Sequence, residues 1–552
     1  MKGTKKYIVG ATVGLLAVFI MSFKDPNDRL FEIAKNLDIY ASLFKELNRS
    51  YVEEINPNTT IKKSIDAMLN SFDPYTVFYA EDDIEDYFTM TTGKYNGIGI
   101  ITGNIENNVT IMMVDEGAPA DKAGLKIGDI ILKVDGVKIN ATKNDEISKL
   151  IKGQSGTNVK LTIKHYGIEK TEEITVKRDI VKIKNVPFYG MINNETGYID
   201  LKNFTAEAAK ETRFAFSELK SKGMKKLVLD VRENPGGLLH MAVEICNIFL
   251  PKGNEIVSTK GKVQEWNKTY TSLNAPQDTI IPIALLANSH SASAAEIVIG
   301  VLQDYDRAVL IGQKSFGKGL VQITKDLSFN TKLKVTTAKY YIPSGRCIQA
   351  IDYAHRNPDG SAGKLPDSLK VAFKTRNGRI VYDGGGVYPD IEIESPNLAT
   401  VTKTLDKKNI IFEYANKYLQ ENPVIGAAKD FALDDRGYQN FVKWAIKKDY
   451  EYSTQVEKDL ETLEASAKKE KYFDLIAEQI NSAKIKLAHG KEADLNKFKD
   501  EIKTLLEQEI VLHAYLQKGL REQSFAKDIE IQEALKLFTN MSKYHSILRG
   551  RK

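Results

Sequence analysis

The sequence is poor in cysteine and histidine: it has two cysteines, Cys246 and Cys347, and seven histidines in 552 residues. Two cysteines exclude a disulfide framework and a four-cysteine zinc site. The histidines are scattered without H-E-x-x-H spacing, so no metal or other cofactor is implied. The net charge of +5 is too small on this length to indicate nucleic-acid binding, and aromatic and basic residues do not interleave as they do on base-stacking surfaces.

The N-terminus carries an apolar run from Tyr7 to Phe23 that follows three lysines. A positive segment followed by an apolar one is typical of an export signal. The run is slightly short of the ~20 residues that a spanning helix needs, and neither an A-x-A site nor a cysteine follows it. We expect residues 1–23 to be a signal peptide, cleaved or kept as an anchor, with the rest outside the cytoplasm (bacterial periplasm or cell envelope). A buried first helix is the alternative.

The remaining chain is too long for one core and divides into four regions. Apolar residues at three- and four-residue spacing predict a helical region over residues 24–95. Short alternating strands fill residues 96–180. Short apolar runs alternate with helical patterns over residues 181–398, as in a sheet covered on both sides. Long charged helices predict a C-terminal helical domain over residues 399–552. The predicted fold class is multidomain α/β.

The β-rich region resembles a PDZ domain in its order of elements and in three stretches: "GIGI" at 97–100, "GAPADKAGLKIGDII" and "VDG". In that family a loop like the one formed by Gly97, Ile98, Gly99 and Ile100 captures a peptide's terminal carboxylate, and the peptide adds to an edge strand. The resemblance therefore implies a peptide-binding domain inserted before the α/β core. A PDZ fold used only as a spacer is the alternative.

One glycine-rich stretch, "GQKSFGKGLVQ", nearly matches the sequence pattern of a phosphate-binding loop. Gly312, Gly317 and Lys318 fit G-x-x-x-x-G-K-[ST], but Gly319 stands where a hydroxyl should hold magnesium. An exported protein also meets no ATP pool. The nucleotide interpretation is therefore doubtful, and Lys318 needs another role.

Two further turns of the core lie next to predicted strand ends. A strand ends at Asp230, and the tight turn Pro235-Gly236-Gly237 follows before a helix. Backbone N–H groups at such a helix start can bind a developing negative charge. Ser293 lies where a second strand and a polar turn enter a helix, between two alanines that leave it open.

Five ordered motifs resemble the carboxy-terminal processing peptidases, also called tail-specific proteases: "DVRENPGG", "SHSASAAEI", "SFGKGLVQ", "AKYYIPSGRCIQ" and "GGVYPDIEI". With the PDZ segment, the resemblance covers roughly residues 40–395. In this family a serine and a lysine 25 residues apart form the catalytic dyad. This register selects Ser293 with Lys318, rather than Ser289 or Ser291. The chain departs from the family at Ala295, where relatives often have a serine.

The chemistry of this pair follows from its titration. A serine hydroxyl needs an adjacent base, and a lysine is a base only when neutral. Lowering its pKa from about 10.4 to ~7–8 takes about three pH units, or roughly 4 kcal/mol of desolvation. We expect apolar neighbours such as Phe316 and Leu320 to cover Lys318 and provide this desolvation.

The resemblance implies further roles. Gln322 matches the residue that orients the lysine. The N–H groups of Ala294 and Gly237 would form the oxyanion hole. Supporting positions near the site are Glu296, Asp230 and Arg232. Arg178, at the junction between the PDZ segment and the core, would report peptide occupancy to the active site by pairing with a core carboxylate only when substrate is bound; an exposed strand-end arginine is the alternative.

The predicted activity is that of a serine endopeptidase that binds the C-terminal tails of exported proteins and cleaves them through an acyl-enzyme. An inactive protease core on an exported PDZ scaffold is the rival, and a histidine-based triad using His240 or His290 is the other enzymatic alternative. Cys246 is expected in the core, and Cys347 near the site as a packing residue. The resemblance is compatible with a homodimer through the N-terminal helices, and the sequence leaves open whether the C-terminal helical domain binds an adaptor, clamps the active site or only packs.

Overall fold

The computed structural model describes residues 26–139, 144–487 and 490–550. The expected export segment 1–23 lies outside the described residues. Among the helices that are described, none is long and apolar enough to span a membrane.

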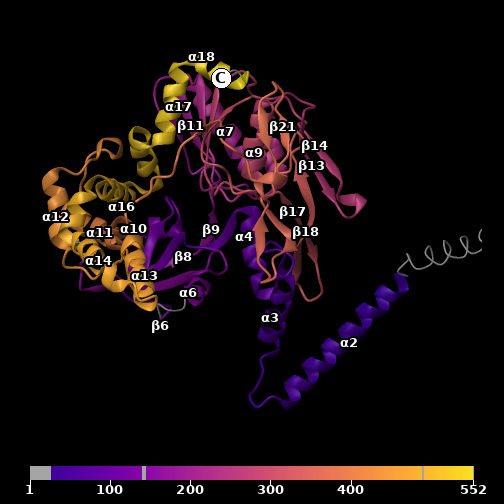
Figure 1. Ribbon diagram of the computed structural model, residues 1–552, viewed down its shortest axis with the longest axis horizontal. Helices are drawn as coiled ribbons and strands as arrows, with labels where there is room; N and C mark the ends of the chain where they lie inside the picture. Colours follow the sequence, from indigo (N-terminus) through magenta and orange to yellow (C-terminus); the bar gives the residue numbers. More distant parts are fainter. Residues whose placement is uncertain (1–25, 140–143, 488–489, 551–552) are drawn as a thin grey trace, which may run out of the picture.

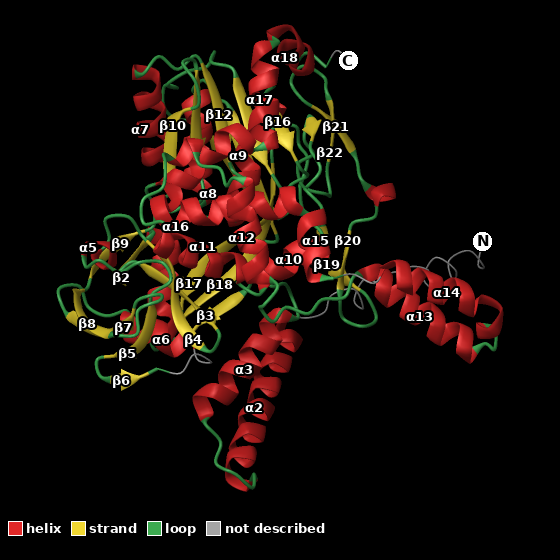
Figure 2. Cartoon of the chain, turned by 90° about the vertical axis from the view of Figure 1, so that its left-hand side faces the viewer, coloured by secondary structure: helices red, strands yellow, loops and turns green. Residues whose placement is uncertain are grey.

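The N-terminal helices α2 (Pro26–Ser50) and α3 (Pro57–Asn70) form a hairpin that projects from the body of the molecule (Figures 1 and 2). Helix α3 begins where Asn56 caps it with its side chain and a proline takes the first helical position. The chain then enters the core as strand β1 (Val77–Tyr79) and turns into helix α4 (Ile84–Thr92).

The PDZ region is a six-stranded sheet with its own core of buried apolar residues. The strand order is β3-β4-β5-β7-β8, with β6 paired to β5. Its elements are β3 (Ile100–Ile105), β4 (Asn108–Val114), α5 (Pro119–Lys122), β5 (Ile130–Val134), β6 (Val137–Lys138), α6 (Asn144–Ile151), β7 (Asn158–Lys164) and β8 (Thr171–Lys177). Two strands join it to the core by pairing with each other, β2 (Lys94–Gly97) and β9 (Asp179–Lys182).

The protease-like core is built on a second six-stranded sheet of order β10-β11-β12-β15-β16-β23. All neighbours are parallel except β10 and β11. The strands are β10 (Phe188–Met191), β11 (Thr196–Asp200), β12 (Lys226–Asp230), β15 (Ile283–Ala287), β16 (Val309–Gly312) and β23 (Ile391–Glu392). Its parallel strands are short apolar runs, as expected for a sheet covered on both faces.

Different parts of the chain cover the two faces of this sheet. In β12, Leu227 and Leu229 point to one core cluster and Val228 points to another, because side chains alternate along a strand. The first cluster is closed by three helices that connect the strands, α7 (Ala208–Ser221), α8 (Leu239–Phe249) and α9 (Ala294–Asp304). The second is closed by the last helices of the chain, α17 (Ile529–Thr539) and α18 (Met541–Leu548).

A smaller sheet lies beside this core and carries the segment after Lys318. Its order is β1-β18-β13-β14, with β17 also paired to β18. The strands are β13 (Glu255–Gly261), β14 (Lys268–Thr271), β17 (Leu320–Asp326) and β18 (Lys332–Tyr341). The remaining short strands are β19 (Ile351–Arg356), β20 (Ala362–Lys364), β21 (Ala372–Lys374) and β22 (Ile380–Tyr382).

The C-terminal region is helical and contacts both other units. Its helices are α10 (Thr400–Lys407), α11 (Ile410–Glu421), α12 (Asp435–Ala445), α13 (Gln455–Lys469), α14 (Phe473–Leu487), α15 (Lys491–Lys497), α16 (Lys499–Lys527), α17 (Ile529–Thr539) and α18 (Met541–Leu548). Phe412 of α11 packs into the PDZ core, while Phe538 and Tyr544 pack on the main sheet. The predicted multidomain α/β fold class is confirmed.

Candidate active site

Ser293 lies at a strained turn between β15 and α9. It has φ 55° and ψ −115°, in a region that residues other than glycine rarely adopt. Its backbone N–H donates to Oε2 of Glu296 at 2.8 Å, across the first turn of α9. Ser291 is buried and donates to the carbonyl of Val231, so its hydroxyl supports the turn. The turn therefore presents Ser293, and not Ser291, at the start of the helix.

Glu296 fixes the lysine loop to the serine turn. Its buried carboxylate accepts hydrogen bonds from Ser315 Oγ at 2.6 Å, Gly317 N at 2.7 Å and Lys318 N at 2.8 Å, in addition to Ser293 N. Burial raises the pKa of Glu296, and these four bonds oppose the rise. The N–H groups of Gly317 and Lys318, which would cradle a phosphate, are thus already paired with a carboxylate, which argues against a nucleotide loop.

The side chain of Lys318 is largely buried. Burial is the first cause that lowers its pKa from 10.5 to about 8, and the positive charge of Lys334 adds to the effect. A base with a pKa near the working pH is effective in proton transfer. Of the two residues expected to cover Lys318, Leu320 is buried, whereas Phe316 is 46% exposed. The sequence did not indicate the actual cover, the ring of Tyr75, whose centroid lies 4.2 Å from Nζ.

The side chain of Tyr340 holds the backbones of Ser293 and Lys318 side by side. The buried hydroxyl of Tyr340 donates to the carbonyls of Lys318 at 2.8 Å and Ser293 at 3.2 Å. In the part of the chain that the structure describes, no hydrogen bond joins Ser293 Oγ to Lys318 Nζ. Gln322 donates to Thr336 Oγ1 at 3.1 Å rather than to Lys318. The structure therefore places Ser293 and Lys318 in one site, with the Lys318 amine over the ring of Tyr75.

The glycine turn after β12 lies against the serine turn. A Cβ on Gly236, which has φ +94°, would lie 2.8 Å from Cβ of Ser293. Asn234 braces the turn, because its side chain accepts from Gly236 N at 2.8 Å and its backbone carbonyl accepts from Ala292 N at 2.9 Å. Among the described residues, no acceptor pairs with the N–H of Gly237. The geometry thus favours Gly237 over Gly236 as a donor to a developing oxyanion.

The N–H of Ala294 is the second expected donor. Ala294 is the first residue of α9, so its N–H has no partner within the helix, and no other described residue accepts from this N–H. The positive end of the helix dipole lies at the same place and also stabilises negative charge there.

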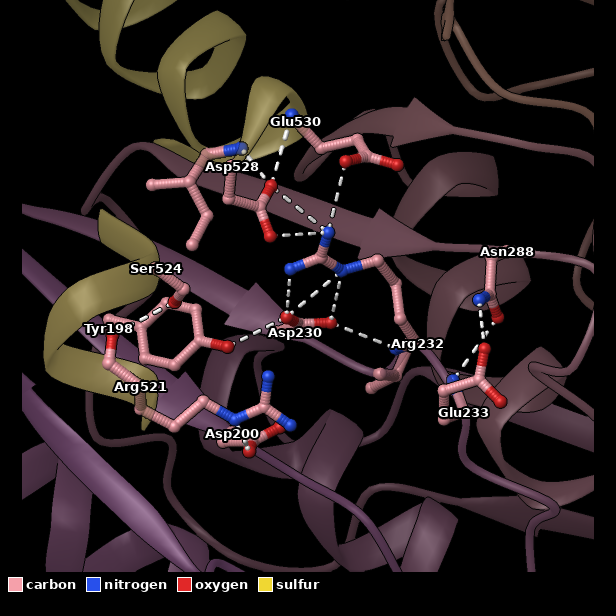
Figure 3. Close-up of polar contacts among 12 residues, drawn as sticks. Tyr198, Asp200, Asp230, Arg232, Glu233, Asn288, Arg521, Ser524, Asp528 and Glu530 are labelled. Carbon is pink, nitrogen blue, oxygen red and sulfur yellow. Dashed lines mark hydrogen bonds and ion pairs between the residues drawn. The ribbon is translucent and has the colours of Figure 1, made fainter. Parts of the chain in front are cut away.

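Asp230 and Arg232 form a buried ion pair at the start of the glycine turn (Figure 3). Burial alone would raise the pKa of Asp230, but the guanidinium outweighs it and holds the pKa well below its usual range. Arg232 also binds Asp528 at 2.9 Å and Glu530 at 3.0 Å, at the start of α17. The pair supports the turn, as expected, and ties it to the C-terminal helices, which no motif had indicated.

The four expected peptide-binding residues all line one groove of about 330 Å³ in the PDZ region. Gly99 has φ +80°, and a Cβ there would lie 2.3 Å from Cβ of Ala118, so only glycine fits this loop. Ile98 is buried and its carbonyl accepts from Ala120 N at 2.8 Å. The opposite wall is helix α6, through Ser148 and Ile151. An apolar groove beside a loop and a helix suits an extended peptide end.

Arg178 is a buried residue of the PDZ region and not an exposed one. Its guanidinium donates to the carbonyls of Ile151 at 2.9 Å, Leu150 at 2.9 Å and Asn158 at 2.8 Å. It thereby satisfies the end of helix α6, which lines the peptide groove. Its pairing with a core carboxylate is expected only when substrate is bound, so its sensor role stays a prediction.

Among the described residues, neither His240 nor His290 forms a hydrogen bond or ion pair with Ser293 or Lys318. His290 is exposed and contacts Glu233 at 2.9 Å, and His240 is exposed on α8. Cys246 is fully buried, as expected, and burial raises the pKa of its thiol and of the half-buried thiol of Cys347. The residues that sequence reasoning missed are Tyr75, Asn234, Ser315, Thr336 and Tyr340; three of them, Asn234, Ser315 and Tyr340, lie inside motifs that it had used.

Three family models match the chain in the order of its structural units. The PDZ domain model matches residues 96–177, Peptidase family S41 matches residues 195–360, and "Probable PDZ-protease, C-terminal helical domain" matches residues 401–538. Together with the fold and the site, they define the class: a serine-type peptidase joined to a peptide-binding domain and a helical domain.

Individual relatives narrow this class. The "Carboxy-terminal-processing protease" of Bartonella bacilliformis is 37% identical over 321 residues, 57% of this chain and 73% of the relative. A "Probable CtpA-like serine protease" of Staphylococcus aureus is 30% identical over 73% of this chain and 76% of its own. The solved photosystem II D1 C-terminal processing protease is 25% identical, covers 64% of this chain and 87% of its own, and has a TM-score of 0.36. The chain belongs to the carboxy-terminal-processing protease family, as its motifs predicted.

Proposed function

We propose that Ser293 and Lys318 are the nucleophile and the general base of a peptide-bond hydrolase. The observation that carries this is Glu296, whose single buried carboxylate binds the backbone of both residues. Lys318 in its neutral form accepts the proton of Ser293 Oγ, and the oxygen attacks the peptide carbonyl. The C–N bond then breaks, Lys318 gives its proton to the departing amine, and water, with Lys318 again as the base, hydrolyses the acyl-enzyme to a carboxylic acid and free Ser293. The N–H groups of Ala294 and Gly237 hold the oxyanion, and Gln322 orients the amine once it turns toward the serine.

The substrate class follows from the PDZ groove. A C-terminal tail would bind with its carboxylate at Gly97–Ile100 and its last side chain in the apolar groove. We place the enzyme outside the cytoplasm, with the tails of exported proteins as substrates, on the basis of the lysine-rich and apolar N-terminal segment.

Two partners remain predictions. Apolar side chains exposed along α2, including Leu30, Phe31 and Leu43, support a homodimer through the N-terminal helices. Analytical ultracentrifugation of the protein and of its Leu30→Glu, Leu43→Glu variant tests this, and an unchanged mass would refute it. An adaptor at the C-terminal helical domain stays a prediction.

The test of the activity is cleavage of an unstructured protein with an apolar C-terminus by the full-length chain. Ser293→Ala and Lys318→Ala are each expected to lower kcat by at least about a thousandfold. Ser289→Ala and Lys314→Ala, which change the same residue types in the same two loops, serve as matched controls and should keep parental rates. Full activity of Lys318→Ala would refute the dyad and favour the alternative, a histidine-based triad that uses His240 or His290. Inactivity of the parent, with no labelling by a fluorophosphonate, would favour the inactive scaffold.

A further inference from the structure

The segment between the N-terminal helices and the core is folded into a tight turn beside Lys318. Asp73 is buried, and its Oδ1 accepts from the backbone N–H groups of Tyr75 and Thr76, each at 2.8 Å. Such a turn fixes the backbone of the two residues that follow the proline. The direction of the Tyr75 side chain is therefore set locally, before any contact with the core.

Tyr75 places its ring over the amine of Lys318, with 4.2 Å between Nζ and the ring centroid. The ring is half-buried, and the ring of Tyr353 meets it edge-on at 6.0 Å. Burial is the main cause that raises the pKa of the Tyr75 phenol, so the ring stays neutral. One wall around the amine is therefore an aromatic face.

The next residue of the same turn reaches the expected orienting residue of the amine. Thr76 Oγ1 accepts from the backbone N–H of Thr336 at 3.3 Å, and the hydroxyl of Thr336 accepts from Gln322 Nε2 at 3.1 Å. Strand β1 then pairs with β18, with Val77 opposite Lys334. The segment thus contacts the amine through Tyr75, and Thr76 is linked to Gln322 by way of Thr336.

We propose that Tyr75 is a positioning residue for the catalytic amine, and that its ring keeps water away from Lys318. This rests on the proposed function, since it assumes that Lys318 is the base. The ring has two opposing effects on a lysine. Its face attracts the ammonium, whereas exclusion of water disfavours the charged amine, and burial is the largest cause that lowers the pKa of Lys318. Exclusion of water is the larger effect, so the ring favours the neutral base.

The charged groups that face the amine come from other elements and remain when the ring is removed. Glu296 of α9 and Asp73 of the turn favour the ammonium, whereas Lys334 of β18 disfavours it. With the ring gone, water reaches the amine and the two carboxylates are no longer opposed by desolvation. The base would then be protonated at neutral pH and active only at higher pH.

The experiment measures the pH dependence of kcat/KM for the full-length protein, with the unstructured protein described above as the substrate. For Tyr75→Ala we expect the acid limb to move up by at least about one pH unit, which lowers kcat/KM about tenfold at pH 7, with a high-pH plateau near that of the parent. Tyr75→Phe keeps the ring and should follow the parent. Phe72→Ala removes an exposed aromatic side chain from the same segment and is the matched control. An acid limb of Tyr75→Ala that coincides with the parent's would overturn the proposal.

The outcome for Lys318→Ala separates this inference from the proposed function. If Lys318→Ala is active, the dyad is wrong and the inference falls with it. If Lys318→Ala is inactive and the limb of Tyr75→Ala has not moved, the dyad stands and the role of Tyr75 is refuted. Should Tyr75→Ala lack a thermal unfolding transition, Tyr75→Gln, of similar length and without a ring, gives the same test with the same expected shift.

Discussion

Replacing Lys318, the proposed general base, should stabilise the protein while it abolishes activity. Lys318 has a pKa of about 8 in the folded chain against 10.5 when unperturbed. The two values lie about 2.5 pH units apart, so burial of the charged amine costs about 3 kcal/mol at pH 6.5, at ~1.36 kcal/mol per pH unit. Lys318→Met keeps the length and shape of the side chain and removes the charge. The free energy of unfolding of Lys318→Met should therefore be higher than that of the parent.

The pH dependence gives the sign of the effect. Between pH 8 and pH 10.5 the unfolded chain binds the lysine proton more tightly than the folded chain, so the parent gains stability as pH rises through this window. The advantage of Lys318→Met should fall from about 3 kcal/mol at pH 6.5 to about 1 kcal/mol at pH 9.5. Any added apolar packing by methionine shifts both values equally, so the change with pH is the informative quantity.

Urea unfolding followed by tryptophan fluorescence measures this difference. The chain has two tryptophans, Trp266 beside the core strand β13 and Trp444 in the helical domain, so a Trp444→Phe background makes the signal specific for the core. Other titrating groups cancel when the two proteins are compared at each pH. A stability difference that stays constant between pH 6.5 and pH 9.5 would refute the buried, partly neutral lysine.

Three further changes test the supports of the site. Glu296→Gln places an amide donor opposite backbone donors and loses at least one of four hydrogen bonds, at ~1–3 kcal/mol each, so kcat should fall at least about tenfold; an unchanged kcat would show that the carboxylate is dispensable. Gly236→Ala puts a Cβ 2.6 Å from the Ala292 carbonyl and should lower kcat by about a hundredfold, whereas Gly253→Ala, with φ +89° in open space, should keep it. The double variant Asp528→Asn, Glu530→Gln removes two partners of a buried guanidinium and should cost about 3 kcal/mol in calorimetry; an unchanged transition would show that the helices are held by apolar packing alone.

The motifs predicted the fold class and the family because their spacing is a property of the chain itself. A register of 25 residues selects Ser293 and Lys318 without coordinates, and a glycine at position 99 follows from the backbone of the loop. The cover of the amine was predicted wrongly in part, because one of the two nearest apolar residues in sequence, Phe316, is exposed. The true cover, Tyr75, lies more than two hundred residues earlier, a separation that no local pattern reveals.

The sequence by itself thus determined the order of the units, the PDZ groove loop and the candidate dyad, since local periodicity and short motifs encode them. Only the tertiary structure decided what surrounds the chemistry. It brings the turn at Asp73–Thr76 onto the lysine and the last helices, α17 and α18, onto the second face of the core sheet. It also joins Arg232 to Asp528 and Glu530. The physical reason is that burial and charge pairing depend on which distant segments meet, and the helical pattern near the C-terminus would look the same whether it packed on this sheet or elsewhere.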